Sequence, residues 1–253
     1  MNTPYHTSRL PIRGLSIALT MSAALATILT PASGRRGLQD VSSGSGVPPK
    51  GAMVLFGGNS EDVGANWLAR DRKSPAGWGV ADRAMLARGG DIISKERFTD
   101  YQLHVEFKVP YMPDAKGQGR GNSGVFMQGR YEIQVLDSYG IADPGTGDCG
   151  AVYSQSAPLI NACKPPKEWQ TYDIVFRAPR FDDAGMLVEK ARVTVRQNGI
   201  VVQNNTEIKS PTWGENFGKL NETGPIVLQD HGNPVEYRNI WILPLPLKGA
   251  AHY

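Results

Sequence analysis

The sequence predicts an all-β protein, an antiparallel β-sandwich of the jelly-roll type, in a single domain over residues 53–246. Short segments in which apolar and polar residues alternate recur along this part of the chain, as in strands with one buried face. Gly, Pro, Asn and Asp separate the segments, and the 29 glycines and 18 prolines suit many turns and few long helices. Only residues 185–192 have a weakly helical pattern. About ten short strands of this kind favour two stacked sheets.

Individual strands can be placed from the same alternation. It is clearest in residues 101–109, where every second residue is apolar or aromatic and the residues between them are polar. Asn198-Gly199 stands between two β-branched runs, a strong signal for a β-hairpin over residues 192–203. Further strands are expected at residues 131–137, 170–176, 225–231 and 235–243.

The N-terminal 34 residues have the pattern of a secretory signal peptide. Arg9 and Arg13 form a positive region, residues 14–29 are an apolar core, and small residues follow at 32–34. A membrane anchor that stays attached is the alternative, but the apolar core is short for a spanning helix. We therefore expect a secreted or periplasmic protein.

Charge and composition exclude several function classes. The formal charge is +3, and without Arg9 and Arg13 it falls to about +1, with 25 basic against 24 acidic residues. No basic field remains to attract nucleic acid. Hydrophobic residues make up 40% of the chain, enough for a core, so wholesale disorder is excluded. Residues 35–52, rich in Ser, Gly and Pro, are predicted to be a flexible leader.

The chain has two cysteines, Cys149 and Cys163. In an exported protein such a pair predicts a disulfide, which would contribute roughly 3 kcal/mol by closing the loop between them. A nucleophilic cysteine would need a histidine nearby in the sequence, and none is present. A zinc site needs more Cys and His residues than the mature chain offers.

Polar residues gather on the outward faces of three predicted strands. Acids, amides and aromatics on such a face suit sugar recognition, which needs polar partners and a flat apolar surface. A solvated sheet face explains any single strand equally well, but three similar clusters favour a binding site. The clusters are His104 and Glu106, then Glu132, Gln134 and Asp137, then Gln229, Asp230 and His231.

Histidine positions narrow the chemistry. His6 lies in the signal segment and His252 at the C-terminal end, so only His104 and His231 can serve the domain. Two histidines cannot build a three-histidine zinc centre, whereas one His–carboxylate pair can transfer protons near neutral pH.

No cofactor is expected. A divalent ion could use oxygen ligands from Asp137, Asp143 and Asp148, but their spacing matches no known loop, so the question of a metal stays open. The Gly-rich residues 117–124 lack the Gly-Lys-Ser/Thr ending of a phosphate loop and precede a strand. They are predicted to form a rim loop that presents Asn122 to a ligand.

Trp67 and Trp78 flank a Pro-Ala-Gly turn near the first strands. We predict that both tryptophans pack in the core, with sugar stacking as the less favoured alternative.

Several of these motifs occur together in the order of a known family. The sequence resembles the 3-keto-disaccharide hydrolase family, long known only as a domain of unknown function, over about residues 53–245. The combination of YEIQVLD with LQDHG is the most specific part. The shared motifs are Phe56-Gly57-Gly58-Asn59, Trp78 with Val80, residues 101–108, Asn122-Ser123-Gly124-Val125-Phe126, residues 131–137, Glu168-Trp169-Gln170-Thr171-Tyr172, Asn198-Gly199, residues 224–232 and Tyr237-Arg238-Asn239-Ile240.

The resemblance implies a concanavalin A-like or LamG-like jelly roll that cleaves glycosides already oxidised to a ketone at sugar C3. Such a ketone acidifies the C2 proton, so a general base can form an enolate, whose collapse expels the C1 substituent with help from a general acid. Later addition of water gives net hydrolysis, and stopping earlier gives a 1,2-lyase. A sugar 3-oxidoreductase is a candidate partner, because the chain carries no dinucleotide-binding fingerprint.

Site roles follow as hypotheses. Glu132 and His231 are candidates for base and acid, in either assignment, with Glu106 and Asp137 as further catalytic candidates. Asn122, Gln134, Gln229 and Asp230 would bind substrate hydroxyls, and Lys95 or Arg238 would stabilise the enolate. A carbohydrate-binding module or lectin is the main alternative, and a structural surface domain is a distant third.

Overall fold

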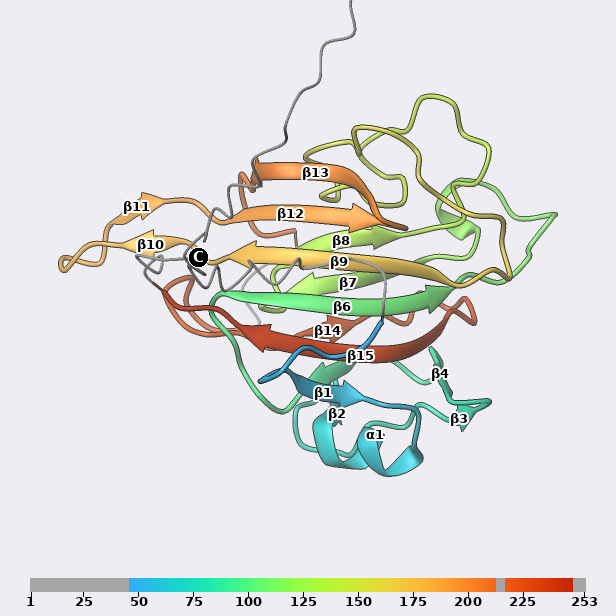
Figure 1. Ribbon diagram of the computed structural model, residues 1–253, viewed down its shortest axis with the longest axis horizontal. Helices are drawn as coiled ribbons and strands as arrows, with labels where there is room; N and C mark the ends of the chain where they lie inside the picture. The colour runs from blue at the N-terminus through green and yellow to red at the C-terminus, as the bar shows by residue number, and fades with distance from the viewer. Residues whose placement is uncertain (1–45, 213–216, 248–253) are drawn as a thin grey trace, which may run out of the picture. The chain divides into compact units, whose positions relative to one another are not determined.

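The computed structural model describes residues 46–212 and 217–247, which all fall within one compact unit, residues 39–253. The predicted signal peptide and the leader up to residue 45 lie outside the described residues. The described chain forms two layers of antiparallel strands (Figure 1), as predicted. Within it, no helix is both long and apolar enough to cross a membrane.

The larger layer has eight strands. Its strands run in the order β13-β12-β9-β6-β15-β4-β3, and β1 also pairs with β15. The non-sequential order, with β6 between β9 and β15, is the crossed connectivity that a jelly roll requires. The bounds are β1 Met53–Phe56, β3 Val80–Ala81, β4 Ala84–Leu86, β6 Tyr101–Lys108, β9 Gln170–Arg177, β12 Arg192–Gln197, β13 Ile200–Glu207 and β15 Glu236–Pro244.

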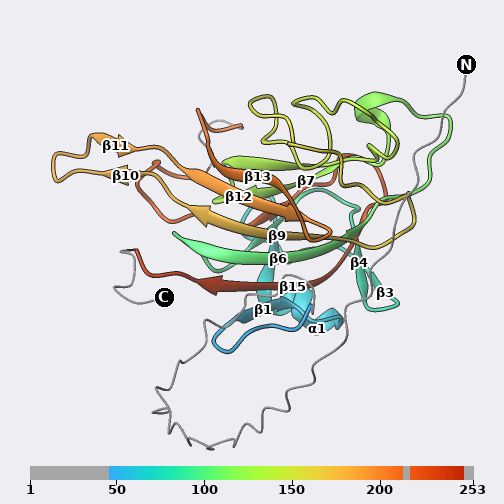
Figure 2. The ribbon, with the colours of Figure 1, turned by 45° about the horizontal axis from the view of Figure 1, so that its top comes forward.

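The second layer has five strands in the order β2-β5-β14-β7-β8. Three smaller elements lie outside the two layers: the hairpin of β10 and β11, the helix α1 and a 3-10 turn (Figure 2). The bounds are β2 Trp67–Ala69, β5 Ile92–Ser94, β7 Ser123–Met127, β8 Tyr131–Val135, β14 Val227–Leu228, β10 Arg180–Phe181, β11 Leu187–Glu189, α1 Ser60–Asn66 and the turn Gly117–Gly119.

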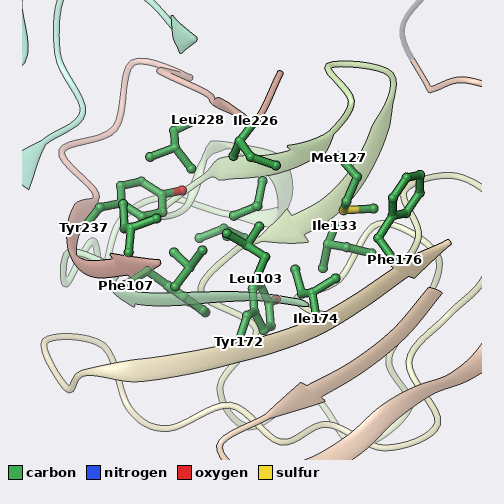
Figure 3. Close-up of a cluster of buried hydrophobic side chains, with 14 of the residues drawn as sticks. Leu103, Phe107, Met127, Ile133, Tyr172, Ile174, Phe176, Ile226, Leu228 and Tyr237 are labelled. Carbon is green, nitrogen blue, oxygen red and sulfur yellow. The ribbon is translucent and has the colours of Figure 1, made fainter. Parts of the chain in front are cut away.

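The core lies between the layers, where the predicted alternation places it. In β6 the side chains of Leu103, Val105 and Phe107 are fully buried against the other sheet. In β8 the core side chains include Ile133, so Glu132 and Gln134 point to the opposite face of the sheet. Figure 3 shows Leu103, Phe107 and Ile133 among the side chains that fill this space.

The predicted hairpin between β12 and β13 is confirmed. Asn198 and Gly199 have φ angles of 52° and 83°, the two left-handed residues that a two-residue type I′ turn requires. Gln197 pairs directly with Ile200 across the turn.

Trp67 and Trp78 are buried in the core, as predicted. Their indole N–H groups donate to the carbonyl oxygens of Leu55, at 3.0 Å, and Gly90, at 2.8 Å. The polar edge of each ring is therefore satisfied by backbone, and neither indole is offered to a ligand.

The structure corrects two expectations about helices. Residues 185–192 form strand β11 and the start of β12 instead of a helix, because Asp182 Oδ1 accepts the N–H groups of Ala184 and Met186 and closes a hairpin turn. The helix α1 was not expected, because seven residues are too few to show a helical period.

The predicted disulfide is absent, because Cys149 and Cys163 are free thiols. The sulfurs are neighbours and each has polar partners: Gln197 Nε2 lies 3.5 Å from Cys149 Sγ and 3.2 Å from Cys163 Sγ, and the Tyr172 hydroxyl lies 3.1 Å from Cys149 Sγ. The spacing of the cysteines correctly indicated their proximity but could not determine whether a bond joins them.

Candidate active site

The outer face of the five-stranded sheet carries a small cavity of about 150 Å³. Strand β8 contributes Glu132 and Gln134 because the residues alternating with them face the core. The cavity is polar, and none of the described residues that line it is a lysine or an arginine. Its lining residues are Gln118, Asn122, Glu132, Gln134, Tyr153, Gln229 and His231.

Glu132 is the acidic group of the cavity. Its side chain is 3% exposed, and its carboxyl makes no hydrogen bond with any described residue. Burial raises the pKa of Glu132 to about 8, with a further contribution from the negative charge of Asp91. The carboxyl therefore carries its proton at neutral pH.

Gly124 on β7 leaves the space that this carboxyl occupies. A Cβ atom at position 124 would lie 2.6 Å from Glu132 Oε1, closer than any real contact. A larger residue at this position would therefore displace the Glu132 side chain.

Three amide side chains form a connected wall beside Glu132. Gln134 Nε2 donates to Gln118 Oε1 at 2.8 Å, Asn122 Nδ2 donates to the Gln118 carbonyl at 2.7 Å, and Gln118 Nε2 donates to the Gly147 carbonyl at 2.8 Å. Gln229 differs, because its buried Oε1 has no hydrogen-bond partner among the residues that the structure describes. A hydroxyl group entering the cavity would supply the donor that this oxygen lacks.

His231 lies exposed at the cavity, on the loop that follows β14. The loop is held by Asp230, whose Oδ2 accepts the N–H groups of Gly89 and Gly90, each at 2.8 Å. The Asp230 N–H in turn donates to Asp91 Oδ1 at 2.9 Å. Asp230 therefore fixes the position of His231, and its carboxylate is occupied by backbone groups.

Five of the residues singled out from the sequence meet in this cavity: Asn122, Glu132, Gln134, Gln229 and His231. Lys95 does not, and its Nζ donates to the carbonyl of Gly64 in α1 at 2.6 Å.

The three aspartates considered as metal ligands have structural partners or lie apart from the cavity. Asp137 accepts from Arg120 Nε at 2.7 Å, and Asp148 accepts from Ser138 Oγ at 2.9 Å. Asp143 is exposed. In the part of the chain that the structure describes, no group of three His, Cys, Asp or Glu side chains is placed to hold a metal ion.

Glu106 and Arg238 lie on the other layer, on the outward face of the eight-stranded sheet. Arg238 Nε donates to Glu106 Oε2 at 2.6 Å, and Asn239 Nδ2 donates to Glu106 Oε1 at 2.8 Å. On the same face His104 Nδ1 lies 2.7 Å from Asp173 Oδ1. This group is a closed network of side chains and does not contribute to the cavity.

The network predicts a pH dependence of stability. Burial alone would lower the pKa of His104, but its contacts with Asp173 and Glu106 outweigh burial and raise it to about 9. The charged form of His104 therefore stabilises the folded chain, by roughly 3 kcal/mol at most. This stabilisation is complete below pH 6.5 and is lost as the pH rises through 9. We expect the free energy of unfolding of the wild type to fall relative to His104→Gln over this range in urea titrations. A difference in unfolding free energy that does not change with pH would contradict a charged His104.

The contacts of Glu106 act in the opposite pH direction. Burial alone would raise the pKa of Glu106, but hydrogen bonds with His104, Asn239 and Arg238 lower it to about 2. The stabilisation that the ionised Glu106 contributes is therefore complete above pH 4.5 and is lost as the pH falls through 2.

Sequence reasoning missed Gln118, Tyr153 and Asp91. Gln118 lies in the Gly-rich rim loop, and Asp91 follows Gly89-Gly90 and precedes an apolar strand, so both carried a weak signal. Tyr153 carried none, because it reaches the cavity only through the path of a long loop.

Comparisons with known proteins agree with the fold. The model of the 3-keto-alpha-glucoside-1,2-lyase-like domain matches residues 51–243. A crystal structure of a candidate glycosyl hydrolase from Parabacteroides distasonis is 41% identical with a TM-score of 0.70, over 78% of this chain and 85% of that one. The comparison with curated proteins found no match.

Two other candidate glycosyl hydrolases from the same organism share the fold. They are 21% and 24% identical, with TM-scores of 0.54 and 0.52. The matches cover 78% and 77% of this chain and 94% and 99% of the other chains. Since the family model spans most of the chain, the protein belongs to the 3-keto-alpha-glucoside-1,2-lyase-like domain family.

Proposed function

We propose that the protein is a carbohydrate-acting enzyme that cleaves 3-keto-glycosides by removal of the C2 proton and elimination at C1. Membership of the lyase-like family and similarity to a candidate glycosyl hydrolase support a glycan as substrate. The observation that carries the proposal is Glu132, a buried carboxyl that is protonated at neutral pH, faces a polar cavity and has no partner among the described residues.

The protonation state of Glu132 suits a general acid. In this scheme His231 takes the C2 proton, the C2 electrons form the enolate of the C3 ketone, and the C1–O bond then breaks. Glu132 gives its proton to the departing oxygen. The products are the free alcohol and a sugar with a double bond between C1 and C2.

Hydrolysis needs only the reverse proton movements. Water adds to C1, the Glu132 carboxylate accepts the water proton, and the His231 imidazolium returns a proton to C2. Both side chains are then restored. Lys95 and Arg238 have no role in stabilising the enolate in this scheme, because both side chains are engaged away from the cavity.

The cavity size limits what enters. At about 150 Å³ it is comparable to about five water molecules at roughly 30 Å³ each. This space suits one sugar ring, so the remainder of a disaccharide stays outside. The keto group must come from a separate oxidation at C3, so we also propose a sugar 3-oxidoreductase as a partner. We further propose that the protein acts after export from the cytoplasm.

The test compares 3-keto-trehalose with trehalose in D₂O. We expect cleavage of the keto form only, with deuterium at C2 of the released 3-keto-glucose in NMR spectra and an enone absorbance if the reaction stops at elimination. Equal cleavage of both sugars, or release without deuterium at C2, would overturn the mechanism. Thermal stabilisation by either sugar without turnover would indicate a carbohydrate-binding module instead.

A further inference from the structure

Asp91 lies immediately before β5 and connects the cavity to the His231 loop. Its side chain is 6% exposed, and Asp91 Oδ1 accepts the Asp230 N–H at 2.9 Å. The carboxylate of Asp230 accepts the N–H groups of Gly89 and Gly90 in return. The segments 89–91 and 229–231 are therefore locked to each other by reciprocal hydrogen bonds.

The second oxygen of Asp91 contacts the side chain of Arg70, which reaches in from solvent. Arg70 Nη1 lies 3.3 Å from Asp91 Oδ2, and the Arg70 side chain is 58% exposed. A partner so open to water is screened and neutralises the buried carboxylate only in part. Ile92 and Ile133 both face the core and are linked across the sheet by Leu228 and Val125, so Asp91 and Glu132, which precede them, lie on the same outward face. Negative charge from Asp91 therefore remains on the face that carries Glu132.

The groups that act on Glu132 and Asp91 come from several elements. Asp91 is the charge that acts on Glu132, and it raises the pKa of that carboxyl in addition to burial. Burial raises the pKa of Asp91, while the hydrogen bond from the Asp230 N–H and the charges of Arg70 and His231 act to lower it. Tyr237, behind the sheet, binds Ser123 Oγ and stays neutral because burial raises its pKa.

We propose that Asp91 is a positioning residue of this site, which holds the His231 loop with one oxygen and places its charge on the face of the sheet that carries Glu132. Asp91 is not among the described residues that line the cavity. The inference rests on the proposed function, in which Glu132 must keep its proton to act as the acid. Without the charge at position 91, Glu132 loses its proton at a lower pH and the activity ends at a lower pH.

Asp91→Asn tests the charge while keeping an oxygen that can accept the Asp230 N–H. We expect the alkaline limb of the kcat/KM profile to move to lower pH by roughly one unit. Arg70→Gln leaves the Asp91 charge uncompensated and should move the same limb to higher pH. Two shifts of opposite sign cannot come from a merely structural role. Asp183→Asn, in the exposed β10–β11 hairpin, changes the net charge equally and should leave the limb unmoved.

A readout without turnover separates this inference from the proposed function. Carbon-13 NMR of the Glu132 carboxyl gives its titration midpoint in the wild type, Asp91→Asn and Arg70→Gln. Unmoved midpoints would overturn the inference even if keto sugars are cleaved. Moved midpoints without cleavage would overturn the proposed function and leave the electrostatic role of Asp91 standing. If Asp91→Asn fails to fold, the titration midpoint of Glu132 in Arg70→Gln alone decides whether the inference stands.

Discussion

Replacing Glu132 with glutamine is expected to lower kcat/KM for a 3-keto-glycoside by about 10²–10⁴-fold, the contribution of a positioned general acid. Glutamine has nearly the same size and keeps the space beside Gly124 filled, but it has no proton to give to the departing oxygen. Steady-state kinetics with 3-keto-trehalose measures the loss. The exposed Glu168→Gln is the matched control and should retain full activity.

The same variant should be more stable than the wild type at neutral and alkaline pH. The pKa of Glu132 is raised from 4.5 to about 8 in the folded chain, so its burial does not destabilise the protein below pH 4.5. The destabilisation grows as the pH rises from 4.5 and is complete once the pH has passed 8. At about 1.36 kcal/mol per pKa unit, the difference approaches roughly 5 kcal/mol. Lost activity with unchanged stability across this range would show that Glu132 is ionised in the folded protein.

Phe107→Ala should produce the largest loss of stability in the core. Phe107 is fully buried, and its ring centroid lies 4.7 Å from that of Tyr172 between the two sheets. Removing a buried phenylalanine costs about 3–5 kcal/mol through lost contacts and the cavity left behind. For a domain of this size that corresponds to a decrease in Tm of about 10 °C.

Denaturant unfolding of Phe107→Ala is best compared with Val175→Ala. Val175 lies on β9 of the same sheet but on its outward face, where it is 39% exposed. We expect a change within about 0.5 kcal/mol for that variant. Similar losses in both variants would mean that the two faces of the sheet are not distinguished as the structure describes.

The fold could be predicted because alternation in strands such as 101–109 directly reflects one buried face, and because Asn198-Gly199 has few alternatives to a hairpin turn. The site could be predicted only in part. Alternation places Glu106 and Glu132 outward in the same way, but it does not say which sheet carries a cavity. Glu106 proved to be paired with Arg238, whereas Glu132 has no partner among the described residues.

The remainder of the site depends on loops, whose paths leave no periodic pattern in the sequence. Tyr153 reaches the cavity from the long connection between β8 and β9, and Asp91 gains its importance from one contact with residue 230, far away in the sequence. The spacing of the two cysteines does not encode whether a disulfide joins them, and in the structure both are free.

The amide wall has a consequence for how relatives of this protein can diverge. Glu132 and Gln134 are built into a strand whose other face is core, so changes there disturb the whole sandwich. Gln118 belongs to a surface turn and is joined to the wall only by hydrogen bonds. This turn can therefore vary among relatives more readily than strand β8 can.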